Sequence, residues 1–177
     1  MITTGVMDNR FTEDWALRNS RSYLAFKLGQ KDYAVNILKV KKVIEMQTMN
    51  FLQQTLAYFA GVIDLRGQHI PVINLRKKFN ISYIGVTERY YVLIVDFASY
   101  STQAVMGIMV DSIPKLVIIK SDDIDDRPGQ IADHETTFVL GKAKVGERLT
   151  TLLDINQVLN QDELQQIRQI LSTANTQ

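Results

Sequence analysis

The side chains that most often perform catalysis are scarce in this chain and far apart in its sequence. Its 177 residues include two histidines, His69 and His134, and no cysteine. Neither histidine has a second ligand at the spacing of a metal site, and the sequence lacks the nucleophile, phosphate-loop, dinucleotide and zinc-protease motifs. We therefore interpret the chain as a binding protein without catalytic residues, metal or cofactor. A small enzyme with an unrecognised active site is the alternative.

An acidic run is the other candidate for chemistry. It reads Asp-Asp-Ile-Asp-Asp over residues 122–126. A calcium loop needs a glycine at its sharp turn and a terminal glutamate, and this run has neither. We therefore expect residues 121–135 to form a solvated loop and not a metal site.

The composition excludes several classes of partner. Hydrophobic residues make up 46% of the chain, charged residues 22%, and the formal net charge is +1. These values are typical of a globular protein with a sizeable core, and the dispersed charge predicts no surface for nucleic acid or anionic lipid. No apolar stretch is long enough for membrane insertion, no signal-peptide pattern is seen, and the absence of cysteine suits a reducing compartment. We expect a cytoplasmic protein.

Two hairpin-like segments position the remaining candidate residues. Residues 61–79 read GVIDLRGQHIPVINLRKKF, with two β-branched runs on either side of a glycine turn. Residues 141–159 read GKAKVGERLTTLLDINQVL and align with them without a gap. We expect positive φ at Gly67, and caps at Asn74 and Asp154 for the helical turn after each hairpin. With similar short strands before each copy, these segments indicate a duplicated unit; chance similarity of hairpins is the alternative.

The rest of the chain predicts short strands and little helix. Residues 1–20 are expected to form a tail or a short helix. Residues 160–177 are expected to form a C-terminal helix with a frayed end, opened by a capping box of Asn160 and Glu163. Connections between the predicted strands are too short for parallel crossover helices. We therefore expect an all-β fold of two small antiparallel barrels, one per repeat.

Four segments resemble the CheW-like domain family of bacterial chemotaxis coupling proteins. They are YLAFKLGQKDYAVNILKVKKVIE, the hairpin at residues 61–79, VMGIMVDSI and LGKAKVGERLTTLLDINQVL. In family order they cover nearly everything from Tyr23 to about Leu164. The resemblance implies a CheW-like domain over residues 21–164, built from two intertwined SH3-like five-stranded β-barrel subdomains with hairpins 61–79 and 141–159 as the repeat.

The resemblance also implies a function. Its members are non-enzymatic scaffolds that couple the cytoplasmic tips of chemoreceptors (methyl-accepting chemotaxis proteins) to the regulatory domain of the CheA histidine kinase. A pilus or other non-flagellar chemosensory pathway is an alternative setting. A nucleic-acid-binding barrel is disfavoured, because such a protein needs a basic, aromatic strand face that this sequence does not show.

By position, the resemblance implies several partner-binding residues. Arg66 matches the family's functionally important arginine, and Val40 and Val43 match apolar contact positions before it. Ile113 and Leu116 match positions near the groove between the barrels, where a receptor helix docks. Gly61, which opens the first hairpin, belongs to the same expected set.

One position departs from the family pattern. Where the family usually has a glutamate that can pair with the arginine, this chain has Lys42. Asp64, two residues before Arg66, or Glu45 is expected to take over the carboxylate role. We interpret Lys42 either as surface drift or as a change of partner specificity by charge.

Overall fold

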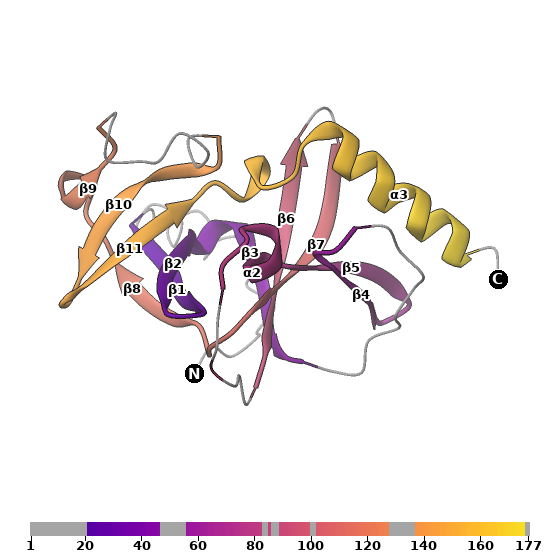
Figure 1. Cartoon of the computed structure of the whole chain (residues 1–177), viewed down its shortest axis with the longest axis horizontal. Helices are drawn as coiled ribbons and strands as arrows, with labels where there is room; N and C mark the ends of the chain where they lie inside the picture. The colour runs from indigo at the N-terminus through magenta and orange to yellow at the C-terminus, as the bar shows by residue number, and fades with distance from the viewer. Residues whose placement is uncertain are drawn as a thin grey trace, which may run out of the picture.

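The computed structural model describes residues 21–46, 56–82, 85, 89–99, 102–127 and 137–175, which form two β-sheets beside a C-terminal helix (Figure 1). Sheet A has the strand order β8-β1-β2-β11-β10-β9, and sheet B has the order β3-β6-β7-β5-β4. The strands of sheet A are β1 (Ser22–Leu28), β2 (Lys31–Asn36), β8 (Lys115–Ile118), β9 (Ile124–Asp125), β10 (Val139–Val145) and β11 (Arg148–Leu153). The strands of sheet B are β3 (Val40–Glu45), β4 (Phe59–Leu65), β5 (Gln68–Asn74), β6 (Tyr91–Ser99) and β7 (Thr102–Val110).

Short helical turns join these strands. They are η1 (Ile37–Lys39), α2 (Leu75–Lys78), η2 (Ser121–Asp123) and η4 (Ile155–Gln157). The long helix α3 spans Gln161–Asn175. The predicted tail at residues 1–20 lies outside the described residues.

The two hairpins that the sequence aligns have the same strand register. In β4–β5, Phe59 pairs with Ile73 and Gly61 with Val72, with a bulge between the two pairs. In β10–β11, Val139 pairs with Leu153 and Gly141 with Leu152, with a bulge at the same place. Residue numbers in the two registers differ by 80 at every pair. The side chains of Asn74 and Asp154 cap the turn after each hairpin, as predicted.

The prediction of one antiparallel barrel per repeat is wrong in one respect, because each sheet takes strands from both halves of the chain. β2 pairs in parallel with β11 of the second hairpin, so that Ala34 faces Leu152. β7 pairs in parallel with β5 of the first hairpin, so that Gly107 faces Val72. Each of the two SH3-like subdomains is therefore built from strands of both repeats. Sequence spacing could not predict this exchange, because it places each strand beside its nearest hairpin in the chain.

The core ties the two sheets together. One cluster of buried apolar side chains draws on both sheets and on α3, including Phe26 of β1, Phe59 of β4, Phe97 of β6 and Ile167 of α3. Two smaller clusters lie within sheet B and sheet A respectively. Since the largest cluster is shared, the two sheets pack as one unit.

The helix α3 begins as predicted. The amide of Asn160 donates to Glu163 Oε2 at 2.8 Å, and the amide of Glu163 donates to Asn160 Oδ1 at 2.9 Å, which is a reciprocal capping box. Leu164 and Ile167 are buried, and Leu171 is half-buried. In Figure 1 the helix lies over the end of sheet B.

The prediction of a solvated loop over residues 121–135 is wrong in its first part. Ile124 and Asp125 form β9, which pairs with Ala143 and Lys142 of β10. The side chain of Arg127 donates two hydrogen bonds to Asp125, at 2.9 and 2.8 Å, and mainly for this reason the pKa of Asp125 is lowered to about 2. The acidic run therefore adds an edge strand to sheet A, which gives this sheet one strand more than the five expected.

Candidate functional site

A mostly apolar groove of about 510 Å³ separates the outermost strands of the two sheets. One wall comes from β3 and β6 of sheet B, and the other from the β7–β8 connection and β8 of sheet A. The residues that line it are Val43, Ile44, Glu45, Tyr91, Ile113, Pro114, Lys115 and Leu116. Ile113 and Leu116 are each 55% exposed. Apolar side chains this exposed in a concave place are typical of a docking surface.

The two walls of the groove are related by the internal repeat. On β3, Val43 lies opposite Leu93 of β6, and on β8, Leu116 lies opposite Leu24 of β1. Leu93 and Leu24 in turn face Ile108 of β7 and Val35 of β2, strands that hold the same place in their sheets. Val43 and Leu116 are therefore equivalent positions. The groove lies between β3 and β8, which are the equivalent edge strands of the two sheets.

The groove offers shape and apolar contact, with charge only at its rim. Glu45 and Lys115 supply that charge, and Glu45 Oε1 lies 3.5 Å from Arg89 Nη1. A site with an apolar floor and a charged rim fits the apolar stripe of an amphipathic helix. Its lining residues include no histidine, and Glu45 is the one carboxylate among them.

A second candidate feature is the turn between β4 and β5. Arg66 and Gly67 are its two central residues, with φ of 53° and 81°. This is the pattern of a type I′ turn, in which both central residues have positive φ, and it confirms the positive φ predicted at Gly67. Asp64 Oδ1 accepts a hydrogen bond from the amide of Gly67 at 2.9 Å. The turn thus holds the exposed Arg66 side chain outward, beyond the end of the sheet.

The predicted carboxylate partner for Arg66 is absent among the described residues. Asp64 bonds the turn backbone and forms no ion pair with Arg66, which lies past the end of β4 and not on the strand face of Asp64. Glu45 pairs with Arg89 instead. Neither of the two carboxylates expected to replace the family glutamate pairs with Arg66 in this structure.

The structure separates the other predicted residues into different places. Lys42 lies on β3 and Arg66 beyond β4, and these strands are the two ends of the sheet B strand order, so nothing here pairs Lys42 with Arg66. Val40 packs against the shared core. Gly61 is buried in β4 with φ of 149°. Val43, Ile113 and Leu116 meet in the groove.

Sequence reasoning missed five lining residues of the groove. They are Ile44, Glu45, Tyr91, Pro114 and Lys115. In the alignment of β3 with β8, Lys115 is the counterpart of Lys42, which does not line the groove and therefore gave no signal for it. No sequence signal identifies Tyr91, because its place on the wall depends on which strand pairs with β3.

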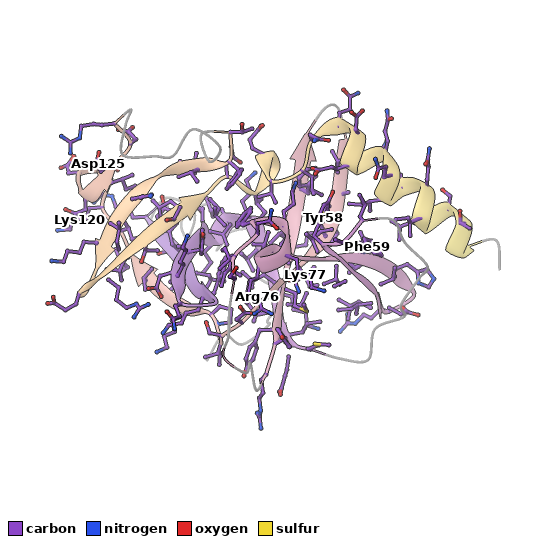
Figure 2. The ribbon with its side chains drawn as sticks, in the orientation of Figure 1. Tyr58, Phe59, Arg76, Lys77, Lys120 and Asp125 are labelled. Atoms are coloured by element: carbon purple, nitrogen blue, oxygen red, sulfur yellow. The ribbon has the colours of Figure 1, made fainter. Side chains whose placement is uncertain are left out.

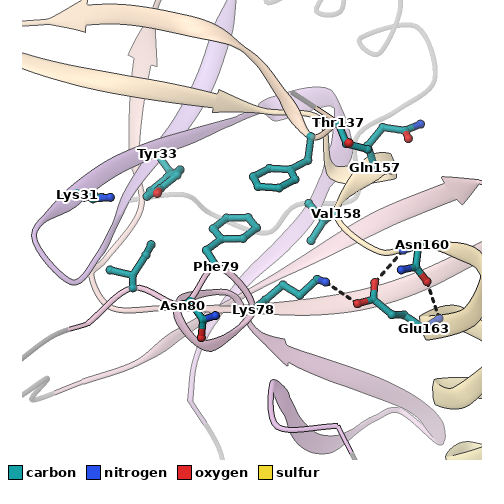
Figure 3. Close-up of a pocket in the computed structure, with 12 residues that line it drawn as sticks. Lys31, Tyr33, Lys78, Phe79, Asn80, Thr137, Gln157, Val158, Asn160 and Glu163 are labelled. Carbon is teal, nitrogen blue, oxygen red and sulfur yellow. Dashed lines mark hydrogen bonds and ion pairs between the residues drawn. The ribbon is translucent and has the colours of Figure 1, made fainter. Parts of the chain in front are cut away.

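A larger cavity, of about 700 Å³, lies on another part of the molecule (Figure 3). Phe79 and Phe138 stack there with ring centroids 4.6 Å apart. Lys78 Nζ lies 2.5 Å from Glu163 Oε1 and 4.8 Å from the ring centre of Tyr58, whose pKa is raised mainly by burial and further by the charge of Glu163. Two of its charged groups, Lys78 and Glu163, already pair with each other, and Glu163 also caps α3. The exposed apolar side chains of the groove, Ile113 and Leu116, make it the better candidate for docking.

Within the described residues, no group of three or more histidines and carboxylates is placed to hold a metal ion. None of the helices in that part of the chain is long and apolar enough to cross a membrane.

Comparison with known proteins gives one consistent family. The family model of the CheW-like domain matches residues 22–163. The Chemotaxis protein CheW of Klebsiella aerogenes is 29% identical over 144 residues, covering 81% of this chain and 84% of its own length. That of Bacillus subtilis is 24% identical over 149 residues, covering 84% and 93%. The crystal structure of the scaffolding protein TtCheW from Thermoanaerobacter tengcongensis superposes with a TM-score of 0.69 at 25% identity, over 79% of this chain and 88% of that one.

Proposed function

Because this chain belongs to the CheW-like domain family, we propose that it is a non-enzymatic scaffold of bacterial chemosensory signalling, which couples chemoreceptors to a CheA-type histidine kinase in the cytoplasm. The observation that carries this proposal is the apolar groove between the two sheets. A scaffold must offer separate surfaces to its partners, and the groove and the Arg66 turn share no residue.

The groove is the proposed site for the receptor. Receptor tips are helical, and an amphipathic helix presents apolar residues at intervals of three and four. The walls present Val43 and Leu116 from equivalent strands, with Ile113 beside them. The rim residue Lys115 supplies a charge that sets the orientation of the bound helix more than its affinity.

The Arg66 turn is the proposed site for the kinase regulatory domain. An exposed arginine without a carboxylate partner in the described part of its own chain is available for a bidentate contact with a carboxylate of another protein. Arginine is also among the residues that most often dominate interface energies.

The test is calorimetry of the whole protein with a fragment of the cognate receptor tip and, separately, with the cognate kinase regulatory domain. Leu116→Lys places a charge in the groove and should weaken receptor binding by about 2 kcal/mol or more, with the kinase affinity unchanged. Arg66→Ala should do the reverse. Leu149→Lys is the matched control, because Leu149 is 61% exposed and lies outside the groove. Equal affinities of wild type and Leu116→Lys for the receptor fragment would refute the groove as the receptor site.

A further inference from the structure

A shielded carboxylate lies where the chain passes from sheet B to sheet A. Asp111 follows β7, and its side chain is 6% exposed. Its Oδ2 accepts a hydrogen bond from the amide of Gly29 at 2.7 Å and lies 3.4 Å from Nε of Arg76, whose side chain is 18% exposed. A carboxylate this shielded is stable only where donors and a cation meet it, so these contacts determine its position.

The partners of Asp111 come from both sheets. Gly29 is in the β1–β2 turn of sheet A, whereas Arg76 is on α2, directly after β5 of sheet B. Figure 2 shows Arg76 in the middle of the molecule, between the strands of the two sheets. The carboxylate therefore joins an element of each sheet through one side chain.

The backbone at Asp111 and the side chain of Ser112 form hydrogen bonds with β1. The amide of Asp111 donates to the carbonyl of Lys27 at 3.0 Å, and the amide of Lys27 donates to Ser112 Oγ at 2.9 Å. The next two residues, Ile113 and Pro114, line the groove. Their position relative to β1 thus follows from the contacts of Asp111 and Ser112.

We propose that Asp111 and Arg76 are positioning residues that set the separation between the two walls of the groove, and so select the helix that it accepts. The inference rests on the proposed function and deepens it. One wall of the groove belongs to sheet B. The other wall begins at Ile113, two residues after Asp111 in the chain. When the contact between Asp111 and Arg76 is removed, the β7–β8 connection stays attached to sheet A but loses its tie to α2, so the wall that carries Ile113 and Leu116 shifts against Val43.

The first test needs no partner. Because the chain has no cysteine, Lys41→Cys and Ile118→Cys give two unique spin-label sites, one on each edge strand and neither lining the groove. Pulsed electron spin resonance should give a single narrow distance between the labels. Asp111→Asn and Arg76→Met should each broaden or shift it. A distribution unchanged by both substitutions overturns the inference, whatever the protein binds.

The matched control is Lys78→Met. The ion pair of Lys78 with Glu163 is shielded to a similar degree, with side chains 19% and 16% exposed, and it lies away from the groove. This substitution should lower the melting temperature as Asp111→Asn does, yet leave the label distance unchanged. An equal broadening with Lys78→Met would assign the effect to general loosening and overturn the inference.

The second test is the affinity for the cognate receptor-tip fragment. Asp111→Asn should weaken it by a factor of about ten, since substitutions in a packed network that touch neither partner change coupling by amounts of that order. The affinity for the kinase regulatory domain should stay unchanged. If wild type binds the fragment and Asp111→Asn binds it equally well, the inference fails and the proposed function stands. If wild type does not bind the fragment, the proposed function fails, and the label distances alone decide the role of Asp111.

Discussion

The hairpins β4–β5 and β10–β11 have the same register, the same bulge and the same capped turn after the second strand, but they differ at their tips. The first is closed by Arg66-Gly67, with positive φ at both residues. The second is closed by Gly146-Glu147, with positive φ at Gly146. Arg66 and Gly146 hold the same position. One hairpin thus has glycine where the backbone needs it, and the other has an arginine.

This difference distinguishes a residue that suits the backbone of the turn from a residue whose side chain serves binding. A residue with a Cβ in the left-handed region costs about 1–2 kcal/mol relative to glycine. Glycine at Arg66 would serve the turn better, as Gly146 does in the other copy. The strain at Arg66 is explained if the guanidinium is needed by a partner.

The largest effect is expected for Arg66→Gly, which makes the first tip like the second. Binding of the kinase regulatory domain should weaken by about 2 kcal/mol or more, roughly 30-fold. Stability should stay the same or rise by up to about 1 kcal/mol, because relief of the left-handed strain outweighs the added freedom of the unfolded chain. Calorimetry and chemical unfolding measure both quantities. A clear loss of stability without a loss of binding would make Arg66 a structural residue.

The next largest effect, a loss of stability, is expected at Gly141, which follows the bulge in β10 as Gly61 does in β4. A Cβ at Gly141 would lie 2.7 Å from Ile124 Cγ2 and 3.0 Å from the carbonyl oxygen of Asp125. Gly141→Ala should therefore push β9 away and destabilise the protein by about 1–3 kcal/mol. The amide protons of residues 124 and 125 should exchange faster in hydrogen-exchange experiments. Unchanged exchange at these two residues would mean that the pairing of β9 with β10 does not require glycine at position 141.

The reciprocal substitution, Gly146→Arg, gives the second tip an arginine. It should destabilise the protein by about 1 kcal/mol, because Gly146 has φ of 61° and nothing within 4 Å of a Cβ placed there, so the cost is backbone strain and not a clash. Urea unfolding measures it. Gly146→Arg should not create a second kinase-binding site; a gain of kinase affinity would show that any arginine at a hairpin tip suffices.

The smallest effect is expected for Lys42→Glu. The family glutamate is restored, but Lys42 and Arg66 are on the two end strands of sheet B and do not pair in the unbound chain. Stability should change by no more than about 0.5 kcal/mol. A double-mutant cycle with Arg66→Ala should give additive changes in the free energy of unfolding. A coupling energy well above that limit would show that the two positions do interact.

Much of the fold could be predicted from the sequence, because the duplicated hairpins carry local signals. Glycine at the turns, Asn74 and Asp154 at the caps, and Asn160 with Glu163 at the start of α3 each depend on residues within a few positions of one another. The exchange of strands between repeats depends on which distant edges meet. No local sequence signal indicates that β2 pairs with β11 or that β7 pairs with β5.

The candidate site divides in the same way. Val43, Ile113 and Leu116 could be named from the family resemblance, and they meet in the groove. Asp64, one of the two carboxylates expected to take over the role of the family glutamate, is near Arg66 in sequence, but the turn directs its side chain to the amide of Gly67. The role inferred for Asp111 had no sequence signal, since its partners Gly29 and Arg76 are far away in the chain.

The central claim is that one molecule carries a receptor site in the groove and a kinase site at the Arg66 turn. Its most direct test is light scattering after gel filtration of the protein mixed with saturating receptor-tip fragment and kinase regulatory domain together. We expect a single complex that contains all three proteins. Leu116→Lys should remove only the receptor fragment from it, and Arg66→Gly should remove only the kinase domain. Displacement of one partner by the other would contradict it, because the two sites would then be one.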